Sequence, residues 1–201
     1  MRLLRRAALH EGAAVIGLLL AVMWVVEIVN KIDGQHLSSD GIYPRSLNGL
    51  PGILSAPFLH AGFDHLIGNT IPFAILGLLV ALGGARRVIA VTAIVAAVAG
   101  LGTWLTASGG SDTIGASGIV FGYAGFLIAR GFFTRRLLEL AMGAIVAVLF
   151  GGALAWDLVP HAGVSWQDHL FGGLGGILAA RLLTHPVRST RRAIGRISAT
   201  D

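Results

Sequence analysis

The chain has 201 residues, of which 55% are hydrophobic and only 12% are charged, and its mean hydropathy is +0.78. A soluble domain has to cover its surface with polar groups, so this balance excludes an ordinary soluble protein and indicates an integral membrane protein. The chain contains no cysteine, which excludes thiol catalysis, disulfide bonds and thiolate metal sites.

Six apolar stretches follow one another along the chain, each near the ~20 residues with which a helix crosses ~30 Å of hydrocarbon. They cover residues 12–29, 66–82, 88–105, 114–129, 137–155 and 169–183. We therefore predict an all-α membrane protein with six transmembrane helices. The first stretch is longer than a signal-peptide core and lacks a small-x-small cleavage site, so we interpret it as an uncleaved anchor. The glycines of the fourth and sixth stretches favour helices inside a bundle.

The cations predict how this bundle is oriented. Arginines gather at the N-terminus and after the second, fourth and sixth stretches, while the other connections hold only Lys31 and Arg45 of the fifteen cations. The positive-inside rule then places both termini in the cytoplasm. We predict a basic cytoplasmic segment over residues 1–11, a membrane domain over 12–184 and a basic cytoplasmic tail over 185–201. Topology accounts for the net charge of +5, so no nucleic-acid partner is expected, although binding of the tail to anionic lipid or RNA is the alternative.

The connection over residues 31–64 is the only long one, and in this topology it lies on the non-cytoplasmic side. It contains Gly, Pro and several apolar residues. This composition predicts short helices lying in the membrane interface rather than a freely moving loop.

Polar side chains occur at one predicted depth in three helices that run in the same direction. His65 and Asn69 are four residues apart, so they share a face at the outer end of the second helix. Ser117 lies about one turn below the outer surface in the fourth helix, and His169 lies in the first turn of the sixth. The pattern pairs a possible nucleophile with a possible base. The alternative is a packing seam with an interfacial histidine, because glycine-flanked serines also pack well in membrane helices.

Small residues follow both Ser117 and His169 on the same helix face. Such stripes allow two backbones to approach closely enough for a Ser–His hydrogen bond of roughly 2.6–3.2 Å. The stripes consist of Gly118, Gly122 and Gly125 after the serine, and of Gly172, Gly173, Gly176 and Ala180 after the histidine.

Four sequence elements occur in a fixed order along the chain: Pro57-Phe58-Leu59-His60, His65-x-x-x-Asn69, Gly115-Ala116-Ser117-Gly118 and His169-x-x-Gly172-x-x-x-Gly176. On these elements the chain resembles the rhomboid family of intramembrane serine proteases, over residues 12–183. The resemblance implies a six-helix rhomboid-like bundle with a long non-cytoplasmic first loop. It also implies a catalytic dyad of Ser117 as nucleophile and His169 as base and then acid, with His65 and Asn69 stabilising the oxyanion.

The same resemblance implies further roles and partners. Five residues would pack the helices and shape the substrate site, namely Gly115, Gly118, Phe121, Gly172 and Gly176. The implied substrates are single-span transmembrane proteins whose helix unwinds near the outer surface of the lipid bilayer. No metal and no cofactor is expected. A structural hydrogen bond is expected for His60. Asp168 is expected to be an interfacial or helix-capping residue rather than a third catalytic residue, because adjacent helical residues point about 100° apart and its side chain would not orient the His169 ring.

The chain departs from the family pattern at two places. Many rhomboids have a tyrosine where this chain has Phe121, which can stack on the catalytic histidine but cannot donate a hydrogen bond. Many also have a Trp-Arg pair in the first loop, where this chain has only Tyr43-Pro44-Arg45. The packing of the first loop is therefore open at this point.

The chain lacks the motifs of other membrane protease classes, while two functions without protease activity remain possible interpretations of the sequence. No HExxH motif follows His10, and the stretches hold no paired aspartates, so zinc and aspartyl membrane proteases are excluded. A non-catalytic rhomboid-like protein that binds membrane clients and a small transporter are the alternatives. Arginine outnumbers lysine fourteen to one, which suggests a GC-rich bacterial genome and hence the bacterial plasma membrane.

Overall fold

The computed structural model describes residues 2–160 and 162–184, so the predicted tail over 185–201 lies outside the described residues. The regular structure of the described residues is helical, which confirms the all-α prediction. In chain order it comprises α1 (Arg2–Ile32), η1 (His36–Asp40), η2 (Leu47–Gly49), α2 (Gly52–Ser55), η3 (Ala56–Phe58), α3 (Phe63–Ala81), α4 (Ala85–Thr106), α5 (Ser117–Thr134), α6 (Leu137–Trp156) and α7 (Trp166–Leu183).

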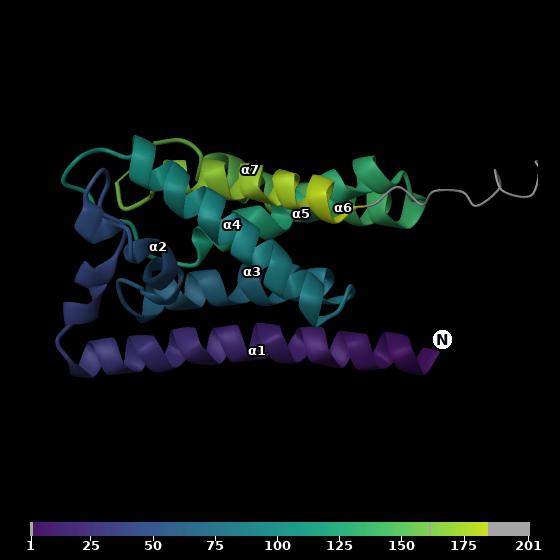
Figure 1. Ribbon diagram of the computed structural model, residues 1–201, viewed down its shortest axis with the longest axis horizontal. Helices are drawn as coiled ribbons and strands as arrows, with labels where there is room; N and C mark the ends of the chain where they lie inside the picture. Colours follow the sequence, from purple (N-terminus) through teal and green to yellow (C-terminus); the bar gives the residue numbers. More distant parts are fainter. Residues whose placement is uncertain (1, 161, 185–201) are drawn as a thin grey trace, which may run out of the picture.

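Five of these helices, α1, α3, α4, α5 and α6, are long and apolar enough to cross a membrane by length and composition. They correspond to the first five predicted stretches. The sixth stretch is also helical, but α7 is not among these candidate spans. The helices run side by side along the long axis of the molecule, with the short helices of the first connection at one end and the N-terminus at the other (Figure 1).

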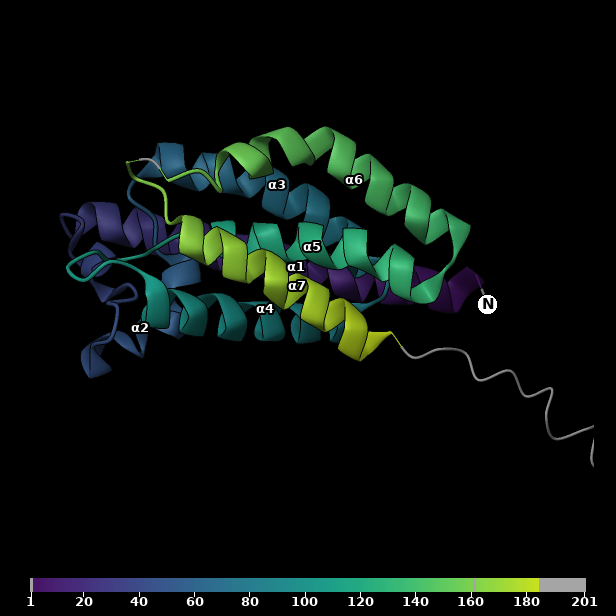
Figure 2. The same cartoon turned by 90° about the horizontal axis from the view of Figure 1, so that it is seen from above.

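The helix α5 lies in the centre of the bundle, between α3, α4, α6 and α7. It is the most deeply buried of the candidate spans, with 61% of its most apolar 18 residues buried, whereas α6 is the least buried, with 11%. Figure 2 shows α6 arching along one side of the bundle, on the side of α5 away from α4. The core therefore forms around α5, and most of the surface of α6 is exposed on the outside of the bundle.

Glycines bring the backbones of α5 and α7 into direct contact. A Cβ added at Gly172 would overlap the carbonyl oxygen of Gly118, and one added at Gly176 would overlap that of Gly122. On the α5 side, a Cβ at Gly125 would lie 2.5 Å from the carbonyl oxygen of Gly173. Side chains at these positions would force the helices apart, so this seam sets how the first turns of α5 and α7 face each other.

The connection between α1 and α3 contains the short helices expected there, and it is fastened to the segment that leads into α5. Ile42 pairs with Thr113 through backbone hydrogen bonds of 3.0 and 3.1 Å. The amide of Gly115 donates to the Ala56 carbonyl at 2.8 Å. The connection therefore helps to place the residues directly before Ser117.

A second fastening joins the connection to the end of α4, where sequence analysis left the packing open. The Arg45 guanidinium donates to the Ala107 carbonyl at 2.8 Å, and the Trp104 indole donates to the Ser46 carbonyl at 2.9 Å. An arginine of the loop and a tryptophan of a helix thus hold the two segments together. Trp104 is a contributor that sequence analysis did not single out.

Candidate active site

Ser117 is the first residue of α5 and is half-buried. Gly115 before it has φ of 120°, a backbone conformation that side chains rarely adopt. A Cβ at Gly115 would also lie 2.8 Å from both Cε1 and Nε2 of His65, and 3.8 Å from the Asn69 amide nitrogen. The structure thus brings His65 and Asn69 of α3 against the turn that carries Ser117, at the N-terminus of a helix.

His169 approaches the same turn from α7. Its side chain is only 4% exposed, and its ring stacks flat on Phe121 with a centroid distance of 4.2 Å and an interplanar angle of 7°. Phe121 lies one turn after Ser117, so the two residues share a face of α5. The stacking expected of Phe121 is therefore present, and it holds the His169 ring beside the first turn of α5.

The hydrogen bonds of the two histidines select opposite neutral tautomers. Nδ1 of His169 lies 2.9 Å from the Asp157 carbonyl oxygen, which can only accept, so Nδ1 carries the proton and Nε2 keeps a lone pair. Nδ1 of His65 instead accepts from the Ala61 amide at 3.3 Å, so its proton sits on Nε2, the atom that faces Gly115. His169 is thus arranged as a base and His65 as a hydrogen-bond donor.

Two expected contacts of the site remain predictions. Within the described residues no hydrogen bond joins Ser117 Oγ to the His169 ring, and the Asn69 amide donates to the His65 carbonyl at 3.1 Å. Catalytic hydrogen bonds are often long without substrate and shorten when it binds. The geometry therefore gathers the four residues without testing their roles.

Asp168 is not the helix cap that sequence analysis suggested. The cap of α7 is Ser165, whose hydroxyl accepts from the Asp168 amide at 3.5 Å, and this cap starts the helix three residues before the predicted stretch. The Asp168 side chain is only 7% exposed, and its carboxylate fills the space where a Cβ of Gly118 would lie. Gly118 thus makes room for a buried carboxylate beside the Ser117 turn.

The ring of His60 packs against the ring of His65. The two rings meet edge to face at 5.1 Å and 68°. Burial, and to a lesser degree the neighbouring His65, lowers the pKa of His60 to about 4, so the ring is neutral at physiological pH. The backbone of His60 is held as well, since its carbonyl accepts from Ser38 Oγ at 3.4 Å.

Sequence analysis missed a buried polar cluster at the C-terminal end of α1, which lies near His60. Glu27 and Asn30 are fully buried, and the Asn30 amide donates to Glu27 at 3.4 Å and to Ser38 at 2.9 Å. Gln35 donates to the other Glu27 oxygen at 3.3 Å. The available signal was a glutamate inside an apolar stretch, because an ionisable residue at membrane depth is costly unless it has partners.

A cavity of about 540 Å³ adjoins the His65 side of the site. Its walls include Ser111 and Ile114 before α5, and Ser165 and Trp166 at the start of α7. The lining includes both polar and apolar side chains.

Comparisons with known proteins identify related chains. The Rhomboid domain matches residues 48–186. "Uncharacterized protein Rv1337" of Mycobacterium tuberculosis is 40% identical over 188 residues, which cover 90% of this chain and 78% of that protein. "Uncharacterized protein ML1171" of Mycobacterium leprae is 40% identical over 196 residues, covering 93% and 77%. "Putative rhomboid protease YdcA" of Bacillus subtilis is 28% identical over 131 residues, 65% of each chain.

Proposed function

This chain belongs to the rhomboid family of integral membrane proteins, and we propose that it is an intramembrane serine endopeptidase with a dyad of Ser117 and His169. One observation carries the proposal. The His169 ring stacks on Phe121, one turn after Ser117 on the same face of α5, and its Nδ1 is bonded to the Asp157 carbonyl, which sets the tautomer that a base requires.

In the proposed reaction, His169 Nε2 takes the hydroxyl proton of Ser117 as Oγ attacks the carbonyl carbon of a substrate peptide bond. The oxyanion that forms is stabilised by His65 Nε2–H, the Asn69 amide and backbone N–H groups at the start of α5. The proton on His169 then passes to the leaving amine and the C–N bond breaks. Water deprotonated by His169 hydrolyses the acyl-enzyme and restores the free serine.

We further propose that α7 is the sixth membrane span and that both termini are cytoplasmic. The first loop, the cavity beside His65 and the start of α5 would then face outward, where water is available. The substrates in this proposal are single-span transmembrane proteins of the bacterial plasma membrane, cut near the outer surface without a metal, a cofactor or a nucleic acid. A peptide bond has to leave its helix before Ser117 can reach it, so substrates with unstable helices are favoured.

The test uses purified protein, a model transmembrane substrate and a fluorophosphonate probe that reacts only with an activated serine. We expect Ser117→Ala and His169→Ala each to abolish cleavage and labelling, and the double variant to be scarcely worse than either, because the two residues act as a unit. Ser111→Ala is the matched control, since Ser111 lines the neighbouring cavity outside the proposed dyad, and it should retain activity.

Cleavage by Ser117→Ala would overturn the assignment. Substrate binding by the unchanged protein with neither cleavage nor labelling would instead favour the non-catalytic client-binding alternative.

A further inference from the structure

A second cavity, of about 580 Å³, lies at the end of the bundle opposite to Ser117, among α1, α3, α4, α5 and α6. Its polar lining is four arginines and one acidic residue: Arg6, Arg87, Arg130, Arg136 and Glu139. Four cations against one carboxylate leave a formal charge of +3 in the lining. A charge of this size within one cavity favours an anionic ligand.

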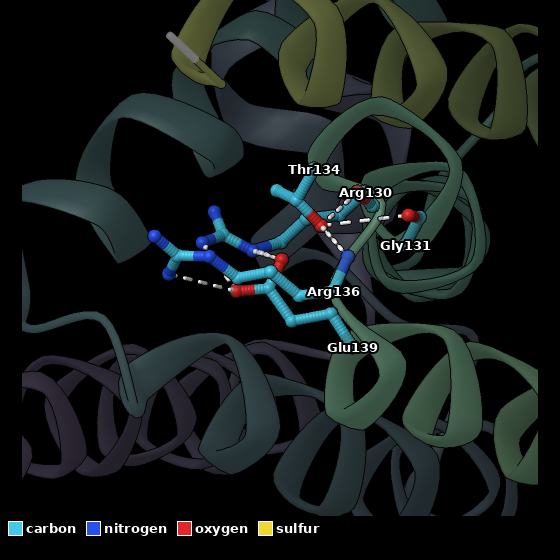
Figure 3. Close-up of polar contacts among 5 residues, drawn as sticks. All are labelled: Arg130, Gly131, Thr134, Arg136 and Glu139. Carbon is cyan, nitrogen blue, oxygen red and sulfur yellow. Dashed lines mark hydrogen bonds and ion pairs between the residues drawn. The ribbon is translucent and has the colours of Figure 1, made fainter. Parts of the chain in front are cut away.

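The single carboxylate is already engaged. Glu139 accepts from Arg130 Nη2 at 3.0 Å and forms an ion pair with Arg130 Nε at 3.0 Å, while Arg136 lies 3.9 Å away (Figure 3). Thr134 ties this turn together, since its hydroxyl donates to the Arg130 carbonyl at 3.0 Å and accepts from the Arg136 amide at 3.4 Å. Arg130 is thus fixed, and its charge is balanced.

The remaining cations are available to a ligand. Among the ion pairs of the described residues, none involves Arg6 or Arg87, and Arg136 is 61% exposed beyond its long contact with Glu139. Arg87 is half-buried, and its guanidinium lies over Gly83, where a Cβ would overlap it. These three arginines come from the starts of α1, α4 and α6, so they converge on one place from separate helices.

The other walls of the cavity are apolar, which separates a lipid from a soluble anion. They include Leu79 of α3 and Leu82 directly after it, Phe126 of α5, and Leu138 and Met142 of α6. Leu82 and Leu138 are 53% and 77% exposed, so the apolar wall continues onto the outer surface of the bundle. Cations at the ends of membrane helices beside exposed apolar side chains match the phosphate and the acyl chains of one phospholipid.

We propose that this cavity, the arginine cavity, binds an anionic phospholipid, with its phosphate at Arg6, Arg87 and Arg136 and an acyl chain along Leu82 and Leu138. The bound group is a phosphate diester, and no bond is made or broken. The proposal does not depend on peptidase activity, because none of these residues belongs to the site around Ser117.

The test titrates the full chain in neutral detergent with phosphatidylglycerol or phosphatidylcholine and measures binding by native mass spectrometry. We expect phosphatidylglycerol to bind at least about tenfold more tightly. The combined variant Arg87→Gln with Arg136→Gln should lose roughly fivefold in affinity for each arginine. The matched control is Arg86→Gln with Arg135→Gln, which removes the same charge from exposed neighbours outside the cavity and should stay within about twofold of wild type.

Two further variants are measured in the same binding experiment. Arg6→Gln removes one exposed cation without touching an ion pair, so it should weaken binding by roughly fivefold even if the double variant folds poorly. Ser117→Ala should bind the lipid like wild type, which separates this proposal from the peptidase. Equal losses in both double variants, or equal binding of the two lipids, would overturn the proposal. Displacement of the lipid by inorganic phosphate at equal concentration would overturn it in favour of a soluble anion.

Discussion

At the scale of single residues, His65 and His169 show how backbone partners give two copies of one side chain different chemistry. A carbonyl oxygen at Nδ1 leaves His169 with a basic Nε2, whereas an amide N–H at Nδ1 leaves His65 with a donor at Nε2. Their substitutions should therefore differ. A glutamine can replace a hydrogen-bond donor, but it cannot replace a base.

The first prediction for these residues concerns the oxyanion. Asn69→Ala should lower kcat by roughly 10²–10³ and change KM by only a few-fold, because the donor matters most when charge develops. His65→Ala should behave similarly, whereas His65→Gln should recover part of the loss and His169→Gln should recover none. Steady-state kinetics on a model substrate measure both constants. An increase in KM alone for Asn69→Ala would reassign that residue to substrate binding.

His60 makes the stability of the fold depend on pH. Its pKa in the folded protein is about 4, below the usual 6.5, so the unfolded chain binds the proton first as the pH falls. Stability should be unaffected above pH 6.5 and should decrease between pH 6.5 and 4, by about 3 kcal/mol in total from this group. Thermal unfolding in detergent across this range measures the effect.

The quantity to compare between variants is the slope of stability against pH, because the substitution itself also changes the absolute stability. His60→Gln removes the titration of this group and should flatten the slope. An identical slope in His60→Gln would show that another group is responsible.

At the scale of helices, hydropathy predicted where the elements lie, because lipid-facing residues such as those of α6 are recorded directly in composition. It placed their ends less well. The helix α1 begins at Arg2 and not at residue 12, since arginine, leucine and alanine continue a helix beyond its apolar part. The hydrogen bonds of Ile42 with Thr113 and of Arg45 with the Ala107 carbonyl join distant parts of the chain, and no local sequence pattern predicts such contacts.

The glycine seam gives the prediction at this scale. Gly172→Ala and Gly176→Ala place a methyl group against backbone of α5, which cannot move aside like a side chain, so each should cost about 1–3 kcal/mol of stability and most of the activity. Gly173→Ala is the matched control, because nothing lies within 4 Å of a Cβ at that position. It should leave activity near wild type. Equal effects at Gly172 and Gly173 would refute the seam.

At the scale of the whole molecule, the two ends of the bundle have different chemistry. The starts of α3, α5 and α7 gather histidines, an asparagine and a serine beside a cavity, while the other end gathers the arginines. The motifs predicted which residues meet at the first end, because helices of equal direction bring them to one depth. They did not predict Glu27, Asn30 and the bonds that set the histidine tautomers, which arise only from packing.

The arrangement of charges in the whole molecule leads to a test of its orientation. The chain has no cysteine, so single cysteines report accessibility without background. We expect Ser111→Cys and Val164→Cys to react with an impermeant maleimide in intact cells, because both line the cavity at the end that should face outward. Ala85→Cys and Thr134→Cys lie at the opposite end, and they keep every arginine that sets the topology, so they should react only after permeabilisation. Labelling of Ala85→Cys in intact cells would show that the protein has the opposite orientation in the membrane. The start of α5 would then face the cytoplasm, and the proposed cleavage near the outer surface would be wrong even if Ser117 were an active nucleophile.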